Sequence, residues 1–284
     1  MVWNFMARNS IALLLFALAA FAAPPPNVVL IISDDHGWSD YGFLQHPHVR
    51  TPHIDALAAE SLLFTRGYVP TSLCRPSLAS IMTGLYPHQH GITGNDPPGN
   101  AQDAELRAQM TAVLRKNPTL MARLAQQGYV AHQSGKWWEG QCTCCGFTEC
   151  MTHGDPTRGG RHGDDGLKIG RETMQPIYDF LDRSKGKPFL LWYAPMMPHT
   201  PHNPPARLLD KYSALPKEQA RYYAMIEWFD ETVGALVKAI DERGLSNDTL
   251  FVYLADNGWV QLPGNQPLWA TRAKMSPYDA GTRT

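Results

Sequence analysis

The sequence has almost no net charge. Its 25 lysines and arginines face 26 aspartates and glutamates, which gives −1 at neutral pH over 284 residues. This balance excludes the strongly basic proteins that bind nucleic acid or anionic membrane surfaces. Internal repeats and long low-complexity linkers are also absent, and the length allows one or two domains. The composition is that of a soluble globular protein.

A hydrophobic run long enough to span a membrane is missing as well. The apolar stretch 11–21 follows Arg8, is short for a membrane span, and has no stop-transfer signal after it. The small residues at 20–22 suit a signal peptidase. We therefore expect residues 1–23 to be a cleaved signal peptide, with a retained anchor as the alternative. The mature protein is then exported, to the periplasm or the medium, without a stable membrane anchor.

Cysteine is scarce and odd in number. With five in an exported chain, at least one is free, modified or paired between chains. Four of them cluster at Cys142, Cys144, Cys145 and Cys150. A zinc site there lacks a matching second pair of ligands, so a disulfide in this loop is the favoured interpretation.

Apolar runs and helical patterns alternate along the chain. Strands are expected over residues 27–33, 129–134, 189–194 and 249–255, with a further candidate at 64–69. Helices are expected over residues 52–63, 118–128, 172–183 and 217–243. This alternation predicts an α/β fold, a mostly parallel sheet with helices on both faces.

Polar groups follow the ends of these strands. They are Asp34, Asp35, Lys136, His199, Asp256 and Asn257. Ligands of open α/β sheets bind outside the carboxyl ends of the strands, so we expect these side chains to meet there. Three carboxylates and one amide oxygen suit a hard cation, Ca²⁺ or Mg²⁺, better than zinc.

A cysteine stands at the start of another predicted element. Cys74 precedes Pro76 and the run 77–82, which predicts a short helix with Cys74 at its N-terminus. Helix N-termini favour bound anions and lower the pKa of a thiol. Taken alone, the segment fits a buried structural cysteine equally well.

Together these segments resemble the ordered motifs of type I sulfatases. The matching stretches are NVVLIISDDHG at 27–37, CRPS at 74–77, TGLYP at 83–87, GKW at 135–137, AP at 194–195, PHTP at 198–201 and DNG at 256–258. The resemblance implies the alkaline-phosphatase-like fold, a mostly parallel sheet sandwiched between helices. It also implies a hydrolase that cleaves sulfate esters of a small molecule or a glycan.

Roles for single residues follow from the same resemblance. A formylglycine-generating enzyme would oxidise Cys74 to formylglycine, the catalytic nucleophile. The implied metal ligands are Asp34, Asp35, Cys74, Asp256 and Asn257, with Ca²⁺ as the expected ion and Mg²⁺ as the alternative. Lys136 would bind the sulfate, His199 would serve the leaving group, and Lys274 would be a second substrate-binding lysine. A solvated Lys274 and a turn or core role for His199 are the alternatives.

The chain departs from the family pattern in three places. Leu78 stands where the signature has an arginine, and Trp138 stands where many members have a histidine, which leaves His153 and His162 as replacement imidazoles. Members also continue beyond the point where this sequence ends, so we expect residues 24–284 to be a catalytic domain truncated at its C-terminus, without the smaller C-terminal subdomain.

Two other functions remain open at this point. One is a phosphate or phosphonate ester hydrolase, because the same site geometry suits both kinds of tetrahedral anion. The other is a non-catalytic relative that binds metal or glycan, which Leu78 favours.

Overall fold

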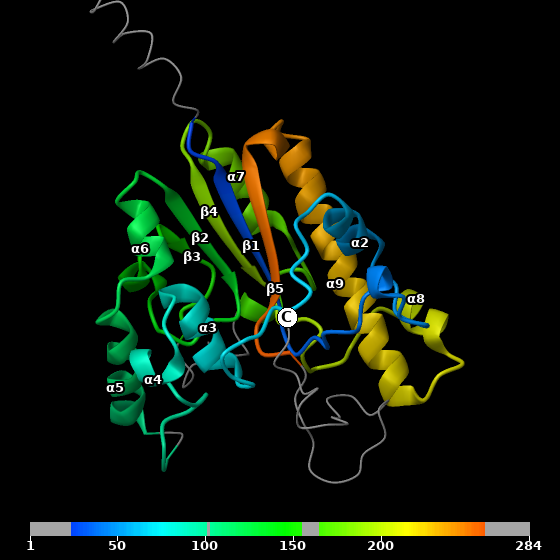
Figure 1. Cartoon of the computed structure of the whole chain (residues 1–284), viewed down its shortest axis with the longest axis horizontal. Helices are drawn as coiled ribbons and strands as arrows, with labels where there is room; N and C mark the ends of the chain where they lie inside the picture. The colour runs from blue at the N-terminus through cyan, green and yellow to red at the C-terminus, as the bar shows by residue number, and fades with distance from the viewer. Residues whose placement is uncertain (1–23, 101–102, 155–164, 259–284) are drawn as a thin grey trace, which may run out of the picture.

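A computed structural model describes residues 24–100, 103–154 and 165–258 (Figure 1). The predicted signal peptide, His162 and Lys274 lie outside these residues. A five-stranded sheet of order β3-β2-β4-β1-β5 forms the centre, and every paired neighbour is parallel. Its strands are β1 (Asn27–Ser33), β2 (Val130–Gly135), β3 (Glu149–Cys150), β4 (Phe189–Ala194) and β5 (Thr249–Ala255).

Helices cover both faces of the sheet. They are α2 (Pro52–Ala59), α3 (Cys74–Thr83), α4 (Pro87–His90), α5 (Ala104–Arg115), α6 (Leu120–Ala125), α7 (Gln175–Arg183), α8 (Ala206–Leu209) and α9 (Lys217–Asp241). Alternate strand residues point to opposite faces. Val29 and Ile31 therefore pack in one core cluster with α2, α7 and α9, while Leu30 and Ile32 pack in another with α3, α5 and α6. The expected α/β sandwich is confirmed.

The strand predictions were more accurate than the helix predictions. Three of the four main strands have the predicted bounds, and β2 is shifted by one residue. Helix α6 begins after Thr119, whose hydroxyl accepts a bond from the amide of Ala122, so the start predicted at residue 118 was too early. Helix α2 ends at Ala59 rather than at 63. The strand candidate at 64–69 was wrong, because it joins none of the five strands and Phe64 is 73% exposed.

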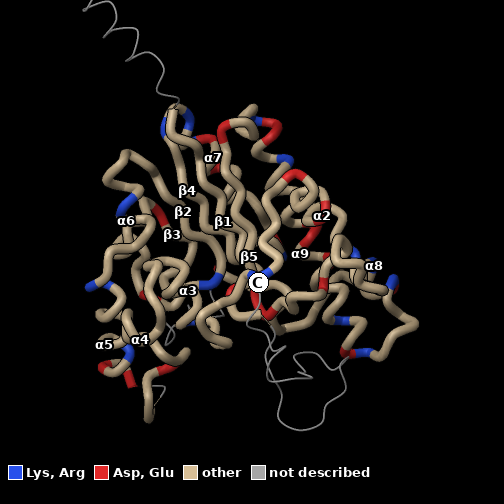
Figure 2. The backbone as a smooth tube through the Cα atoms, in the orientation of Figure 1, with Lys and Arg blue, Asp and Glu red and all other residues tan. Residues whose placement is uncertain are grey.

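Charged residues are rare in the strands themselves. Figure 2 shows them in the loops and helices, including the loops at the lower ends of the strands, where the strands have their carboxyl ends. In the described part of the chain, no helix has the length and apolar character needed to cross a bilayer.

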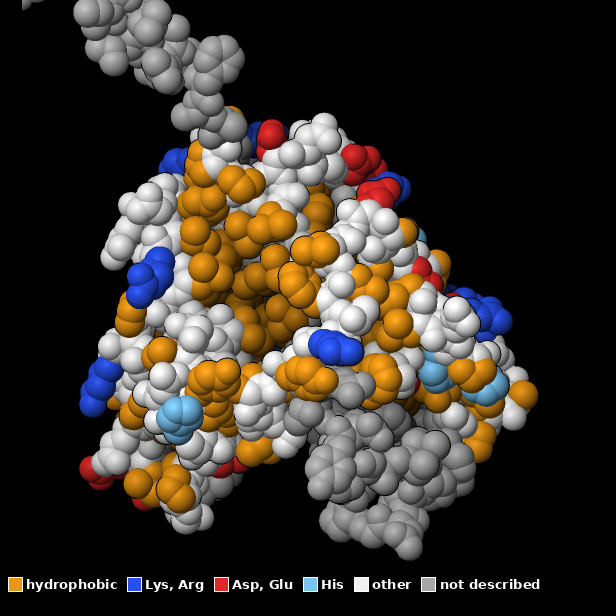
Figure 3. All heavy atoms as spheres, viewed as in Figure 1, with side chains coloured by type: hydrophobic (Ala, Val, Ile, Leu, Met, Phe, Trp, Pro, Cys, Tyr) orange, Lys and Arg blue, Asp and Glu red, His pale blue; other side chains and the backbone are white. Residues whose placement is uncertain are grey.

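The sheet is incompletely covered at its β5 edge. Among the described residues, strand β5 pairs with β1 alone, and Leu250 is 53% exposed. Val28, Val252 and Leu254, on the same face, are only partly buried. Figure 3 shows apolar side chains gathered in a hollow over these strands. We call these four residues the β5 apolar face.

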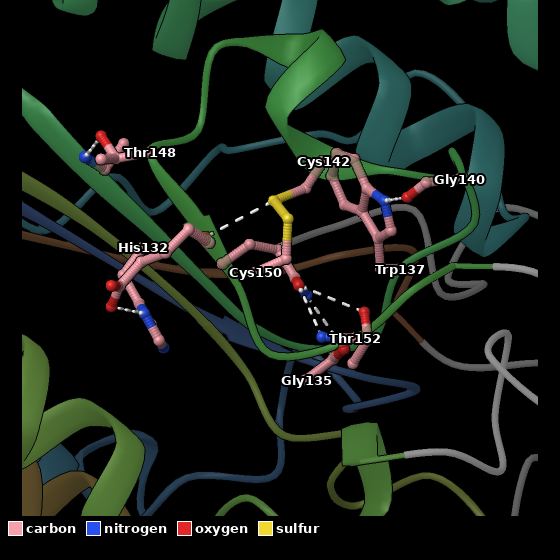
Figure 4. Close-up of a disulfide and its surroundings, with 11 residues drawn as sticks. His132, Gly135, Trp137, Gly140, Cys142, Thr148, Cys150 and Thr152 are labelled. Atoms are coloured by element: carbon pink, nitrogen blue, oxygen red, sulfur yellow. Dashed lines mark hydrogen bonds and ion pairs between the residues drawn. A yellow bond between two sulfur atoms is a disulfide. The ribbon is translucent and has the colours of Figure 1, made fainter.

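The cysteine cluster forms a disulfide, as the sequence favoured. Cys142 and Cys150 are bonded, which ties the turn after β2 to the short strand β3 (Figure 4). Cys144 is exposed and Cys145 buried, and both are free thiols. Among the residues that the structure describes, no cysteine of this cluster belongs to a group with the geometry of a metal site, so the zinc alternative finds no support.

Candidate active site

Residues from four strand ends meet in one buried cluster. Asp34 follows β1, Lys136 follows β2, His199 lies in the loop after β4, and Asp256 follows β5. Each has a relative exposure of 9% or less. The parallel sheet explains this meeting, because all carboxyl ends of its strands lie at the same edge.

Lys136 joins two of the carboxylates. Its ammonium nitrogen lies 2.6 Å from Asp34 Oδ2 and 3.7 Å from Asp256 Oδ2. Burial alone would lower the pKa of Lys136, but the negative charge of Asp34 and its neighbours outweighs burial and raises that pKa. Burial raises the pKa of Asp256, and the charge of Asp34 adds to the effect. The Lys136 ammonium thus lies between two carboxylates, of Asp34 and Asp256, whose negative charges repel one another.

Asp35 holds the other side of the cluster. Its carboxylate accepts a 2.9 Å bond from Asn257 Nδ2 and lies 3.5 Å from His199 Nε2. The Asp35 backbone has φ of 58°, in the left-handed region that residues other than glycine seldom adopt. Such strain costs on the order of 1–3 kcal/mol and persists where surrounding contacts enforce it. With this backbone conformation, the carboxylates of the successive residues Asp34 and Asp35 both lie in the cluster.

Cys74 is the first residue of α3, as predicted. The sulfur and carboxylate oxygens of Asp34 and Asp256 lie within 4.8 Å of one another, and a second group of that compactness joins Asp34, Asp35 and His199. The hydroxyl of Ser77 donates to the carbonyl of Asp256, which anchors the helix against β5. The lowered thiol pKa that the sequence predicted is wrong, because burial raises the pKa of Cys74 to about 12 despite the nearby charge of Lys136.

A buried ion pair lies directly behind this cluster. Arg75 donates to both oxygens of Glu139, at 2.7 and 2.8 Å, and the two side chains are 4% and 2% exposed. The amide of Arg75 also donates to the side chain of Asn95. The residue after Cys74 is therefore tied to the loop that carries Lys136.

Arg171 holds the loop that carries His199. Its guanidinium donates to the carbonyls of Met196 and His199, at 3.0 and 3.2 Å, and to Pro201 and Asn203. Met196 has a φ of 53°, so this loop also contains a strained residue. Neither Arg171 nor Glu139 has a sequence signal that would have marked it.

The departures from the expected motif also have a place in the structure. Leu78 is 4% exposed and packs in the apolar cluster beside Cys74. The ring of Trp138 lies 4.8 Å from the Lys136 nitrogen. His153 lines a cavity that Trp138 also lines.

Comparison with known proteins decides the family. A sulfatase family model matches residues 26–281. The chain belongs to the sulfatase family. Human arylsulfatase A is 30% identical over 86% of this chain and 55% of its own length, and human N-acetylgalactosamine-6-sulfatase is 26% identical over 84% and 51%. This sulfatase chain thus spans about half the length of these relatives.

Solved structures agree on the fold. The crystal structure of Ps i-CgsB superimposes with a TM-score of 0.70 at 25% identity, covering 91% of this chain and 62% of that one. The phosphonate monoester hydrolase of Agrobacterium radiobacter has a TM-score of 0.56 at 18% identity, with 82% and 62% covered. The second match supports the alkaline-phosphatase-like fold and carries no argument about the substrate of this sulfatase chain.

Proposed function

We propose that this chain is the catalytic part of a sulfuric ester hydrolase. The observation that carries the proposal is the convergence of Cys74, Lys136 and His199 on one cluster of carboxylates, in a chain of the sulfatase family. A site for a sulfate ester needs positive charge for the anion, a nucleophile, and a proton donor for the leaving oxygen. The cluster offers a residue for each of these roles.

A divalent cation fits the donor set. We propose Asp34, Asp35, Asp256 and Asn257 as its ligands, with Cys74 beside them. Asp256 Oδ2 and Asn257 Oδ1 are buried without a hydrogen-bond partner among the described residues, although buried oxygens normally have one. Oxygen donors suit Ca²⁺ or Mg²⁺, with Ca²⁺ as our expectation. Such an ion would polarise a bound sulfate.

The hydrogen bond of His199 determines which nitrogen faces the site. Its Nδ1 lies 2.6 Å from the carbonyl of Thr200 and therefore donates to it. Nε2 is left toward Asp35 and the cluster. We propose that Nε2 exchanges a proton with the leaving alcohol, while Lys136 binds the sulfate. Lys274 would add a second cation.

Cys74 is the proposed nucleophile position, after oxidation to formylglycine by a generating enzyme. A buried thiol with a pKa raised to about 12 is a poor nucleophile, which favours a modified residue for this role. Leu78 argues in the other direction, because the signature arginine is missing. A non-catalytic relative that binds metal or glycan is therefore the second candidate.

The proposed substrate is a sulfated glycan or a smaller sulfate ester. Ps i-CgsB, one of the structural relatives, has also been solved in complex with k-i-k-neocarrahexaose, an observation that supports an oligosaccharide. We also propose export after removal of residues 1–23. Sequencing the N-terminus of protein recovered from the periplasm or medium tests the cleavage.

Two measurements test the catalytic proposal. One is the mass of the peptide containing Cys74, from protein isolated from its host; the other is turnover of an aryl sulfate. We expect turnover to follow the modified fraction and to disappear in Lys136→Met. Lys187→Met is the control, because Lys187 is exposed and lies just before β4, at the opposite end of that strand from the site. Protein that carries formylglycine at position 74 and hydrolyses no sulfate ester would overturn the proposal.

A further inference from the structure

The turn after β1 carries both Asp34 and Asp35, and its conformation decides where their carboxylates lie. The amide of Asp34 donates to the carbonyl of Met197 at 2.9 Å, which ties the turn to the loop after β4. Asp35 then has the left-handed φ of 58°. A residue other than glycine keeps such a backbone only where its surroundings enforce it. The contacts of Asp35 are therefore what hold the two carboxylates in place.

Asp35 is held by groups on several sides. Its amide donates to Asp256 Oδ1 at 3.3 Å, and its carboxylate contacts Asn257 and His199. These three partners belong to the cluster, where a bound cation or substrate would engage their side chains. The backbone carbonyl of Asp35 accepts a 3.1 Å bond from the hydroxyl of Tyr222. Tyr222 lies on α9, outside the cluster, so its bond to Asp35 does not compete with a ligand.

The hydroxyl of Tyr222 bridges two residues of the turn. Its oxygen accepts a 3.1 Å bond from the amide of Gly37, and its proton can go to the carbonyl of Asp35 or to Asp40 Oδ2, 3.2 Å away. Burial raises the pKa of Asp40 to about 7, and in its protonated form this carboxyl can donate to the hydroxyl. The hydroxyl proton is then left for the carbonyl of Asp35. Tyr222 is 3% exposed, so water has little access to these bonds.

Helix α9 makes Tyr222 a firm support. Phe229 lies two turns further on the same side of this 25-residue helix, is buried in the core under the sheet, and has its ring 6.4 Å from that of His36. The ring of Tyr222 also lies 5.8 Å from that of His202, three residues after His199. Tyr222 therefore contacts both the turn after β1 and the loop after β4, from a rigid element.

We propose that Tyr222 is a positioning residue for the cation site. Its hydroxyl fixes the turn of residues 34–37, and with it the carboxylates of Asp34 and Asp35, whether or not an ion is bound. This inference rests on the proposed function and adds to it a residue outside the cluster. Without the hydroxyl, the carbonyl of Asp35 and the amide of Gly37 lose their shared partner. The left-handed conformation then competes with others, and the two carboxylates are less well placed for a cation.

Tyr222→Phe tests the proposal, because it keeps the ring and its packing and removes only the hydroxyl. The first measurement is a calorimetric titration with Ca²⁺ alone. We expect the affinity to fall at least tenfold, since groups that orient metal ligands typically change metal affinity by about 10–100-fold. The second is amide hydrogen exchange of the ion-free chain. Exchange should rise in the peptide covering residues 33–41 and stay unchanged over residues 226–240 of α9.

Two further variants separate this role from a general effect of the substitution. Tyr223→Phe removes the hydroxyl of the next buried tyrosine, which accepts a bond from Gln219 of the same helix, and should leave both measurements unchanged. Asp40→Asn keeps a group that can donate to the Tyr222 hydroxyl, so its Ca²⁺ affinity should stay within twofold. The proposal requires both changes in Tyr222→Phe. Either one alone, neither, or a tenfold loss of affinity in one of these two variants would overturn it.

The same measurements distinguish this inference from the proposed function. If the unmutated chain binds Ca²⁺ and shows the expected losses in Tyr222→Phe but hydrolyses no sulfate ester, the proposed function fails and this inference stands. If it hydrolyses a sulfate ester and Tyr222→Phe binds Ca²⁺ normally, this inference fails and the proposed function stands. A chain that binds neither Ca²⁺ nor Mg²⁺ overturns both the cation site and this inference.

Discussion

Replacing Arg171 by methionine should loosen the loop that carries His199. The change keeps a long apolar stem and removes every donor of the guanidinium. Two of its bonds, to the carbonyls of Met196 and His199, are partly buried. A hydrogen bond to a charged group contributes about 1.5–3 kcal/mol, so at the lower value their loss costs about 3 kcal/mol. The remaining bonds, to Pro201 and Asn203, are exposed, and water replaces them at little cost.

The loss should appear in stability and in local exchange. We expect urea unfolding of Arg171→Met to show a free energy about 3 kcal/mol below that of the unmutated chain. Amide hydrogen exchange should rise in the peptide covering residues 195–204 and stay unchanged in β4. Lysine keeps the charge without the planar fork, so Arg171→Lys should fall between the two. Arg207→Met is the control, because its pair with Glu231 lies at the surface, where such pairs contribute little.

Turnover distinguishes a role of Arg171 in positioning His199 from a role in stability alone. A displacement of about 1 Å at a catalytic group can reduce the rate about 10²-fold. We therefore expect kcat for an aryl sulfate to fall by that order in Arg171→Met, with KM less affected. The reasoning is refuted if the variant unfolds within about 0.5 kcal/mol of the unmutated chain, the usual range for surface changes, and keeps its kcat.

Four further changes test other parts of the structure. Asp256→Asn should abolish binding of Ca²⁺ in calorimetry, and Asp248→Asn, at the opposite end of β5, should leave it intact; equal binding by both would argue against the cation site. Leu78→Arg, which restores the arginine of the family signature, should raise both oxidation of Cys74 by the generating enzyme and turnover of an aryl sulfate; unchanged oxidation and an unchanged rate would show that Leu78 limits neither step. Burial raises the pKa of Asp40 to about 7, so between about pH 4 and 7 this carboxyl is protonated in the folded chain and ionised in the unfolded chain. The free energy of unfolding should therefore fall as pH rises through this range, by at most about 1.4 kcal/mol per pH unit. Asp40→Asn should flatten that slope in urea titrations. Leu250→Lys should reduce self-association in light scattering, because it puts charge on an exposed apolar edge, and undiminished association would exclude the β5 apolar face as its cause.

The sequence predicted most of the sheet, and it predicted that the polar residues after the strands lie close together. Buried parallel strands read as continuous apolar runs, a local pattern, and β4 is buried at all six positions. Polar residues directly after such runs must lie at one edge of the sheet. The positions of Asp34 and Asp256 could therefore be predicted without knowing the structure.

The supporting residues could not be found in this way. Glu139 acts through a partner 64 positions away, and Arg171 binds a loop that begins 25 positions after it. Such contacts depend on how distant segments pack, and no local pattern encodes them. The pKa of Cys74 was mispredicted for the same reason. The helix N-terminus was visible in the sequence, but the burial that outweighs it was not.

The bond between Arg75 and Glu139 has a consequence for motion. It joins the start of α3 to the loop after β2 just behind Cys74 and Lys136, so these two elements share one rigid support. We therefore expect Cys74 and Lys136 to move together, with little change in the distance between them. Fluctuations of the surrounding protein would then change access to the site more readily than the spacing of the groups within it.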